Sequence, residues 1–357
     1  MPILFVVPDL FGYGGVQLFS QLALRALTEE FGASRGIQIL SRMDLSDTMT
    51  NNGIDQPFVA CGGSLLRFAT EYTRLVNITS WDAIVFMHIN PIRLNFLKLR
   101  RQRSAVIIHG IEVWRRLSKV FQSALSRVDR IISNSGHTIR HACEINPWMA
   151  RIPTSVCHLG VPESPLDAEL NLPRIGPEYV LSIGRMVEKE RYKGFDELIA
   201  IWPRIELARP GIRLKLMGDG PDRPRLEAAA RAVGANIDFL GRVSDMDRDI
   251  HLRNCSAFAM PSRGEGFGLV YLEAMRLGRP VLAGNTDAGG EVFEDRISGR
   301  AVNPVDSDEL CEGLLDVLGP NGESYGILGR KRFYEHFTYE HFKTRFLAPI
   351  RDLVSCR

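Results

Sequence analysis

The chain has 357 residues, of which 45% are hydrophobic and 24% charged, and its formal net charge at pH 7 is +2. This length predicts two domains, and this composition excludes disordered, collagen-like and small disulfide-rich proteins. No run of ~18 apolar residues occurs, and the N-terminal segment lacks the basic start and cleavage site of a secretory signal, so we expect a cytoplasmic chain without membrane spans.

Strand-like and helix-like runs alternate along the chain, a pattern typical of parallel βαβ units. Strands are predicted at residues 3–7, 37–40, 83–87, 105–108 and 130–133, with a helix at 15–31. A segment rich in proline and acidic residues, 161–180, interrupts the pattern. It restarts with strands at 179–183, 213–217, 237–240, 257–260, 280–283 and 300–302. We therefore predict an α/β fold of two Rossmann-like doubly wound domains, residues 1–165 and 166–337, and a terminal helix within 338–357.

The segment Pro261–Met275, PSRGEGFGLVYLEAM, joins a predicted strand to a predicted helix. Its three glycines allow a ligand to approach the backbone, and the free N–H groups of a helix N-terminus favour an anion such as phosphate. Glu265 lies in the glycine loop and Glu273 in the helix, so one ligand could contact both carboxylates. A surface glutamate and a helix-favouring glutamate would give the same spacing by chance.

The Glu265-x7-Glu273 spacing in this loop resembles the signature of the retaining glycosyltransferases of family 4. The resemblance implies the GT-B architecture, in which two domains face each other across a cleft and a C-terminal helix crosses back to the first domain. It implies transfer of a hexose from a nucleotide-diphosphate sugar, with Glu265 beside the donor sugar and Glu273 on the ribose. The nucleotide-sugar site would also include Gly266, Phe267, Gly268 and Leu269.

Two loops of the first domain fit the same resemblance. The loop PDLFGYGGVQ enters a helix at Gly14 and Gly15, without the spacing of a dinucleotide fingerprint or the lysine of a P-loop. By resemblance this Gly-Gly loop approaches the donor diphosphate; otherwise it is a tight turn. His109 ends the strand AVIIH, and family members use a histidine here to contact the donor sugar. His88, at the end of the preceding strand, is the alternative.

The second domain supplies the cations that a leaving diphosphate needs. Arg185 follows a strand and Lys193 precedes Gly194, which resembles the family's G-R…K-G element, with Lys189 as a rival for Lys193. We predict that Arg185 and Lys193 act catalytically together with Glu265 and His109. Three further residues match family positions that line the nucleotide: Gly218, Arg242 and Val243.

The sequence predicts neither a metal nor a cofactor. His137, His141 and Glu144 lack a further ligand, and Asp245-x-Asp247 is explained by helix capping. The six cysteines are far apart and are predicted to be free thiols.

Basic residues are concentrated in the first 165 positions, which hold 17 Lys and Arg against 12 Asp and Glu. Much of the excess lies between Arg93 and Arg130, interleaved with Leu, Phe and Trp. We expect this patch to contact an anionic membrane rather than nucleic acid, because no nucleic-acid module is present.

The predicted partners are a nucleotide-sugar donor, with UDP ranked before GDP, and a saccharide or lipid-linked acceptor in polysaccharide or glycoconjugate biosynthesis. The alternatives are a GT-B sugar-nucleotide epimerase or hydrolase and a non-catalytic nucleotide-binding protein. An epimerase would share the fold, and a hydrolase could use Glu265 and Glu273 as its two carboxylates. A binding protein would not need His109 or Glu265.

Overall fold

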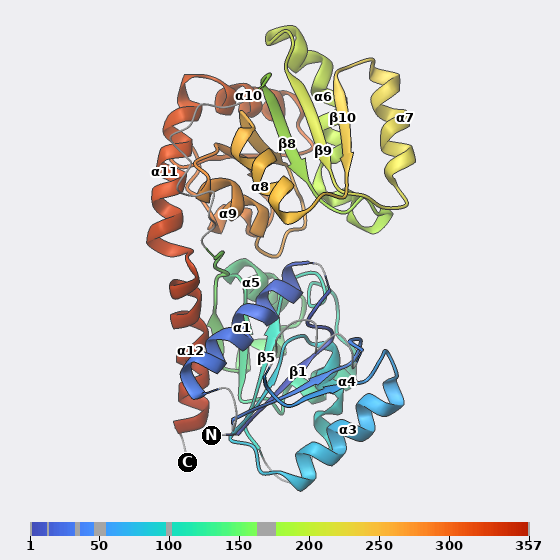
Figure 1. Cartoon of the computed structure of the whole chain (residues 1–357), viewed down its shortest axis with the longest axis vertical. Coiled ribbons are helices and arrows are strands. Elements are labelled where there is room, and N and C mark those ends of the chain that lie inside the picture. The colour runs from blue at the N-terminus through green and yellow to red at the C-terminus, as the bar shows by residue number, and fades with distance from the viewer. Residues whose placement is uncertain are drawn as a thin grey trace. The chain divides into compact units, whose positions relative to one another are not determined.

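A computed structural model describes residues 2–12, 14–32, 36–45, 55–97, 102–162 and 176–355. The chain forms two compact units, Met1–Leu159 together with Tyr339–Arg357, and Gly160–Thr338. Each unit is a parallel sheet with helices on both faces, which confirms the predicted fold class (Figure 1). The predicted domain boundary at 165/166 lies outside the described residues.

The first unit has a seven-stranded parallel sheet in the order β3-β2-β1-β4-β5-β6-β7. Its strands are β1 (Ile3–Val7), β2 (Ile37–Ser41), β3 (Phe58–Ala60), β4 (Ala83–Phe86), β5 (Ser104–Ile108), β6 (Arg130–Ser133) and β7 (Thr154–Val156). Its helices are α1 (Gly15–Phe31), α3 (Leu65–Ile78), η1 (Asn90–Leu97), α4 (Lys119–Leu125), α5 (Gly136–Ile145), η2 (Pro147–Arg151) and α12 (Tyr339–Ser355). α3 and α4 cover one face of the sheet, and α1 and α12 cover the other.

The second unit has a six-stranded parallel sheet in the order β10-β9-β8-β11-β12-β13. Its strands are β8 (Tyr179–Ile183), β9 (Arg213–Met217), β10 (Ile237–Gly241), β11 (Ala257–Met260), β12 (Val281–Gly284) and β13 (Arg300–Val302). Its helices are η4 (Glu188–Lys193), α6 (Phe195–Ala208), α7 (Arg223–Val233), α8 (Asp245–Asn254), α9 (Leu269–Arg276), η5 (Ala288–Glu291), α10 (Ser307–Leu318) and α11 (Pro320–His336). α6, α7 and α10 pack on one face, and α8, α9 and α11 on the other.

The central strands of both sheets are apolar because parallel sheets are buried on both faces. β1, β4 and β11 are buried at every position. The helices bury an apolar side against the sheets, as in α3, which buries Phe68, Tyr72 and Leu75.

The terminal helix α12 belongs to the first unit, as predicted, and lies against α1 (Figure 1). Phe19 of α1 packs edge-on against Phe342 and Phe346 of α12, with ring centroids 5.1 and 6.1 Å apart. Around this apolar contact, Glu29 accepts hydrogen bonds from Tyr339 and Lys343. Apolar packing ringed by ion pairs therefore attaches the end of the chain to its beginning.

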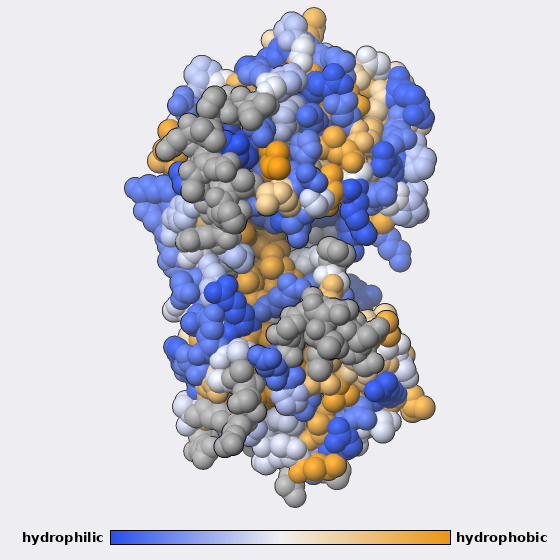
Figure 2. All heavy atoms as spheres, in the orientation of Figure 1, coloured by the Kyte–Doolittle hydropathy of each residue, from blue (hydrophilic) through white to orange (hydrophobic). Residues whose placement is uncertain are grey.

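Hydrophilic and apolar residues are intermixed on the surface of both units (Figure 2). Among exposed apolar side chains, Leu65, Leu66 and Ile78 lie on α3 of the first unit. Within the described part of the chain, no helix is long and apolar enough to cross a membrane.

Candidate functional site

The predicted catalytic residues of the second unit follow neighbouring strands. β8 pairs with β11, and β11 pairs with β12. The strand order reverses between β8 and β11, because the chain runs outward to β10 on one side and to β13 on the other. Ligands of open α/β sheets bind at the carboxyl ends of the strands at such a switch point. Arg185 follows β8, Glu265 follows β11 and Asp287 follows β12, so all three lie at this edge.

Lys193 and Glu265 form an ion pair at this edge. The Lys193 Nζ lies 2.5 Å from Glu265 Oε1, and the two side chains are only 15% and 16% exposed. Burial disfavours the charge of Lys193, but the Glu265 carboxylate, the Tyr192 hydroxyl and Glu190 outweigh it and raise the pKa of the ammonium. Lys193 therefore stays protonated at neutral pH. Its rival Lys189 is exposed and is not part of this pair.

Glu190 joins the second predicted cation to the same cluster. The Arg185 Nε donates to Glu190 Oε2 at 3.3 Å, and the Lys193 Nζ lies 4.0 Å from that oxygen. Glu190 is buried, whereas the Arg185 side chain is 71% exposed. The cluster thus holds two cations and two carboxylates, with the Arg185 guanidinium open to solvent. Sequence analysis missed Glu190, because an acidic residue in the basic run EKERYK looks like surface charge.

Two glycines allow Lys193 to reach Glu265. A Cβ atom on Gly184 would lie 2.7 Å from Lys193 Cδ, so only glycine leaves room for the lysine stem above the end of β8. Gly194 has φ 87°, and a Cβ there would lie 2.5 Å from the Pro261 carbonyl oxygen. Positive φ and this close approach both require glycine. The G-R…K-G element is therefore a packing device as well as a source of charge.

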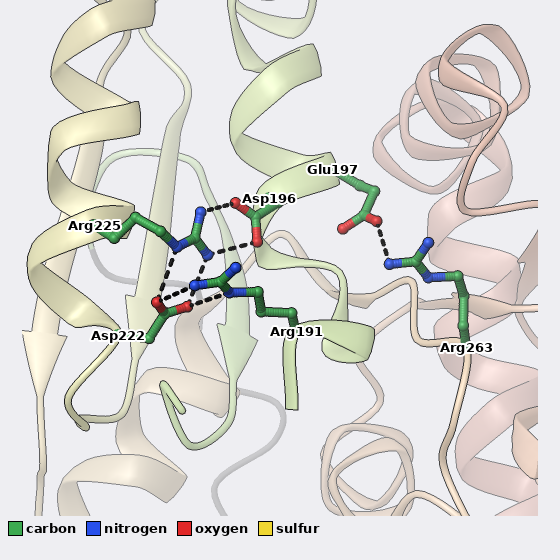
Figure 3. A network of polar contacts seen from close by, with 6 residues as sticks. All are labelled: Arg191, Asp196, Glu197, Asp222, Arg225 and Arg263. Carbon is green, nitrogen blue, oxygen red and sulfur yellow. Dashed lines mark hydrogen bonds and ion pairs between the residues drawn. The ribbon is translucent and has the colours of Figure 1, made fainter. Parts of the chain in front are cut away.

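An ion-pair network fixes the segment that carries Lys193 (Figure 3). Arg191 of η4 donates two hydrogen bonds to Asp222, at 3.0 and 2.8 Å. Arg225 of α7 donates to both Asp222 and Asp196, so η4, α6 and α7 are tied together. The two guanidinium groups hold the pKa of Asp222 well below its usual range.

The Glu265 loop is anchored to the same segment. The Arg263 N–H donates to the Tyr192 carbonyl oxygen at 2.8 Å, and its guanidinium pairs with Glu197 of α6 at 2.9 Å (Figure 3). A Cβ on Gly264 would lie 3.1 Å from the Tyr192 ring, so the loop packs closely on this aromatic side chain. Lys193 and Glu265 thus face each other from two segments that are bonded together.

The rest of the loop offers backbone rather than side chains to a ligand. Phe267 is 2% exposed, and its ring packs against Phe337 with centroids 6.0 Å apart. Gly268 has φ 89° and precedes the first residue of α9, Leu269, while Gly266 is half-buried. The predicted nucleotide-sugar role of Phe267 therefore falls on its peptide group.

Glu273 lies in the second turn of α9 and is 6% exposed. Burial raises the pKa of its carboxyl group, an effect that Arg248 of α8 opposes from 3.5 Å. Its Oε2 atom is buried and accepts no hydrogen bond from the described residues. Buried carboxylate oxygens normally have donors, so this oxygen is an exception among buried acceptors. Arg248, which sequence analysis missed, gave no signal beyond its place on a polar helix.

The remaining predicted nucleotide residues of the second unit follow β9 and β10. Gly218 has φ 133°, and a Cβ there would collide with the Gly184 carbonyl oxygen, so close packing alone explains this glycine. Arg242 is exposed and Val243 half-exposed, just after β10. These residues lie beyond β9 and β10, on the side of β8 opposite to β11.

In the first unit, His109 and His88 stack at the ends of β5 and β4, with ring centroids 6.0 Å apart. His109 Nε2 lies 2.9 Å from the Met87 carbonyl oxygen, an acceptor, so this nitrogen carries the proton. His88 Nδ1 accepts the Asn90 N–H at 3.1 Å, so its proton is on Nε2. Burial lowers the pKa of both rings, to about 4 for His88, where Glu112 opposes the shift and His109 adds to it. The pair is neutral at pH 7.

Gly14 and Gly15 are exposed at the start of α1. Gly14 is the N-terminal cap, with φ 141°, and neither a side-chain cap nor an acidic residue covers the first turn. The Leu18 N–H donates to the Gly14 carbonyl oxygen at 3.0 Å. The N–H groups that precede Leu18 in this turn have no carbonyl acceptor within the helix itself.

The acidic pair Asp245-x-Asp247 is a capping feature, as predicted. Ser244 accepts the Asp247 N–H at 3.1 Å at the start of α8.

His141 contacts Glu144 at 3.2 Å and stacks on His137. Across the described ranges, the structure contains no group of three or more His, Cys, Asp or Glu residues arranged to hold a metal ion.

Two arginines of the basic patch at 93–130 make cation–π contacts within the first unit. The Arg93 guanidinium lies 5.3 Å from the Phe121 ring centroid, and the Arg127 guanidinium lies 4.5 Å from that of Phe96. These cation–π contacts join η1 to α4 and its following turn. Arg115, Arg116 and Lys119 remain exposed, whereas Arg100 and Arg101 lie outside the described residues.

Both the second unit and the whole chain resemble known proteins. Residues 177–319 match the family model of the glycosyl transferases group 1. A GDP-mannose-dependent monoacylated alpha-(1-6)-phosphatidylinositol monomannoside mannosyltransferase of Corynebacterium glutamicum is 30% identical over 253 residues, and the match covers 65% of either chain. The O-antigen chain mannosyltransferase C of Escherichia coli is 26% identical over 273 residues, covering 71% of this chain and 70% of that one. The chain thus spans slightly less than two thirds of the length of the Corynebacterium relative.

Among solved structures, the sucrose-phosphate synthase of Thermosynechococcus elongatus superposes with a TM-score of 0.82 at 19% identity, over all of both chains. At this identity the likeness establishes the fold. The chain has the fold of the GT-B glycosyltransferases, and residues 177–319 of its second unit match the group 1 glycosyltransferase model.

Proposed function

We propose that this chain, a GT-B fold with a group 1 glycosyltransferase domain, is a retaining hexosyltransferase of family 4 that needs no metal. It moves a sugar from a nucleotide-diphosphate sugar to a saccharide or lipid-linked acceptor. The observation that carries the proposal is the cluster of Arg185, Lys193 and Glu265 at the switch point between β8 and β11. A cluster of cations at that edge fits a diphosphate.

In the proposed reaction, the bond between the anomeric carbon and the diphosphate oxygen breaks. A new bond forms to an acceptor oxygen, which loses its proton. Negative charge accumulates on the leaving diphosphate, and fixed cations stabilise it most effectively where they need not reorganise. Lys193 is fixed by Glu265 and by its packing over Gly184, and Arg185 is held by Glu190. These cations take the place that a divalent metal fills in other transferases.

Other residues bind the parts of the donor. Glu265 positions the sugar. Glu273 accepts hydrogen bonds from the ribose hydroxyls, which would supply the donors that its buried Oε2 lacks among the described residues. His109 contributes neutral imidazole contacts to the sugar. The backbone of residues 266–269, the exposed glycines Gly14 and Gly15, and residues 218, 242 and 243 complete the proposed nucleotide-sugar site.

For the donor we propose GDP-mannose, with UDP sugars second. The sequence ranked UDP first from family frequency alone. Both relatives compared above are named as mannosyltransferases, and the name of one specifies GDP-mannose. Their names also specify a phosphatidylinositol mannoside and an O-antigen chain, which supports a lipid-linked or polysaccharide acceptor at the inner face of the cell membrane.

The test is donor turnover without added metal. Purified protein is incubated with GDP-mannose, UDP-glucose or ADP-glucose in excess EDTA, with and without a membrane extract as source of acceptor. We expect acceptor-dependent release of GDP from GDP-mannose and an α-linked product. Acceptor-independent release would indicate a hydrolase, and a changed sugar without transfer would indicate an epimerase. Nucleotide binding without turnover of any donor would indicate a binding protein.

A further inference from the structure

Asp287 is a buried carboxylate that the proposed chemistry does not yet use. It follows β12, the strand next to β11, and is 6% exposed. Sequence analysis assigned it no role, because nothing in NTDAGG singles out the aspartate. The structure shows instead that its side chain bonds outside its own turn.

Asp287 and its neighbour bind both peptide groups of Glu265. Asp287 Oδ2 accepts the Glu265 N–H at 2.8 Å, and the Ala288 N–H donates to the Glu265 carbonyl oxygen at 3.2 Å. The other oxygen, Oδ1, accepts the Gly289 N–H at 2.9 Å and so fixes the turn itself. The backbone of Glu265 is therefore held from β12, while its carboxylate is held by Lys193.

A carboxylate suits this position because two N–H groups approach it from different segments. Each needs its own oxygen, and an asparagine would place an NH₂ group against one of them. Ser262 also bonds to Asp287, and burial raises the pKa of the carboxyl group to about 7 despite these donors. Replacing the carboxylate should therefore shift the Glu265 peptide rather than leave it in place.

We propose that Asp287 is a positioning residue for sugar transfer, whose carboxylate sets the Glu265 backbone and thereby the Glu265–Lys193 pair. This inference rests on the proposed function for its kinetic consequence. Its structural consequence does not depend on that function: loss of the Asp287 carboxylate should weaken the Glu265–Lys193 pair and expose the Lys193 ammonium.

The experiment compares Asp287→Asn and Asp287→Ser with Asp306→Asn. Asp306 is a matched control, because its carboxylate also accepts two backbone N–H groups in the same unit, at the start of α10. Lys193 and Lys189 are labelled with acetic anhydride, and the labelling rates are read by mass spectrometry. Steady-state kcat and KM are measured for release of GDP from GDP-mannose with the membrane extract.

We expect Asp287→Asn to raise the labelling rate of Lys193 at least about fivefold, with Lys189 unchanged, and to lower kcat at least about tenfold with KM within about threefold. Asp306→Asn should change neither labelling nor kcat. Asp287→Ser keeps one hydroxyl acceptor and places no NH₂ group against an N–H. Its Lys193 labelling rate and its kcat should therefore lie between those of wild type and Asp287→Asn. A wild-type kcat in Asp287→Asn overturns the proposal, and so does unchanged labelling. If the wild-type enzyme turns over no donor, the proposed function fails, and labelling alone decides whether Asp287 holds the pair.

Discussion

Lys193 Nζ lies 2.5 Å from Glu265 Oε1, although 72 residues separate the two in the chain. β8 and β11 are neighbours in the sheet, so the loops that follow them meet. The pair explains how a lysine can be only 15% exposed and still charged. Under the proposed function, the donor diphosphate would share Lys193 with the Glu265 carboxylate, which is already paired with it.

Replacing Lys193 by alanine should reduce turnover at least about 100-fold, because preorganised charges of this kind contribute about 3 kcal/mol to the transition state. It should also lower the melting temperature, since Glu265 is left without its buried counterion. Lys189→Ala is the matched control, because Lys189 is exposed on the same segment. Damage from Lys189→Ala with wild-type activity in Lys193→Ala would move the diphosphate site to Lys189. Turnover and thermal unfolding are measured on the same preparations.

The sequence was sufficient to predict most of the fold and to single out Lys193 and Glu265, although not that they form a pair. Long apolar runs such as 3–7 and 179–183 match β1 and β8 in full, because parallel strands buried on both faces are predominantly apolar. β3 and β7 were missed. Each is a three-residue edge strand, too short for any periodicity to show, and β7 has no buried residue.

Within the site, sequence predicted the residues whose types carry chemistry and missed those that act by contact. Arg185, Lys193 and Glu265 stand beside glycines, which mark backbone approaches. Glu190 contacts Arg185 and Lys193 of its own segment, but nothing in the run EKERYK shows that it is buried. Asp287 owes its role to Glu265, which lies in a different segment, and no residue beside Asp287 signals this. Only the strand order, which pairs β11 with β8 and β12, brings such residues together.

GDP should stabilise the protein without added metal. A ligand at 100 times its dissociation constant adds about 2.7 kcal/mol to the free energy of unfolding. Glu273→Gln should lose most of this shift, because the carboxylate is the proposed ribose acceptor. Glu309→Gln, in the first turn of α10 at the far end of the β13 connection, should keep it. The measurement is a thermal-shift screen of GDP, UDP and ADP in EDTA. An equal response to all three, or none, contradicts a nucleotide-specific site.

The network of Figure 3 should contribute more to stability than a surface ion pair. Arg225 bonds Asp196 and Asp222 together, so Arg225→Ala should lower the free energy of unfolding by about 1–2 kcal/mol. Arg204 pairs with Asp308, and both are more than half exposed, so Arg204→Ala should change the free energy of unfolding far less. Urea unfolding of the two variants compares them directly, and equal losses would mean that the network adds nothing beyond its pairs.

The stability of the protein should depend on pH through Asp287. Its pKa is about 7 in the folded chain, raised by burial and by the facing Glu265 carboxylate, against about 3.9 in an unfolded chain. The folded state therefore binds the proton more tightly, and this group makes the free energy of unfolding fall as pH rises from about 4 to 7. Asp287→Asn removes the titration. The free energy of unfolding is measured in urea at pH 5 and pH 8 for both proteins. From pH 5 to pH 8, that of wild type should fall relative to that of Asp287→Asn. The same difference between the two proteins at both pH values would be inconsistent with a raised pKa.

The exposed basic residues of the first unit should bind anionic vesicles. Arg115, Arg116 and Lys119 are exposed, and the neighbouring Val120 is 54% exposed, so charge and apolar surface occur together. Each basic residue near an anionic bilayer contributes about 1 kcal/mol. Replacing all three by serine should therefore weaken binding to phosphatidylserine vesicles about 100-fold at low salt, measured by sedimentation.

The control for vesicle binding removes the same charge elsewhere. Arg231, Arg296 and Lys331 are exposed in the second unit, and replacing them by serine should leave sedimentation nearly unchanged. Because Arg93 and Arg127 are engaged with Phe121 and Phe96, their removal would disturb packing as well as charge and is a poorer test. Equal pelleting with neutral and anionic vesicles would show that charge does not drive the binding, and equal losses in both triple variants would show that net charge alone does. Either result contradicts a membrane role for this patch.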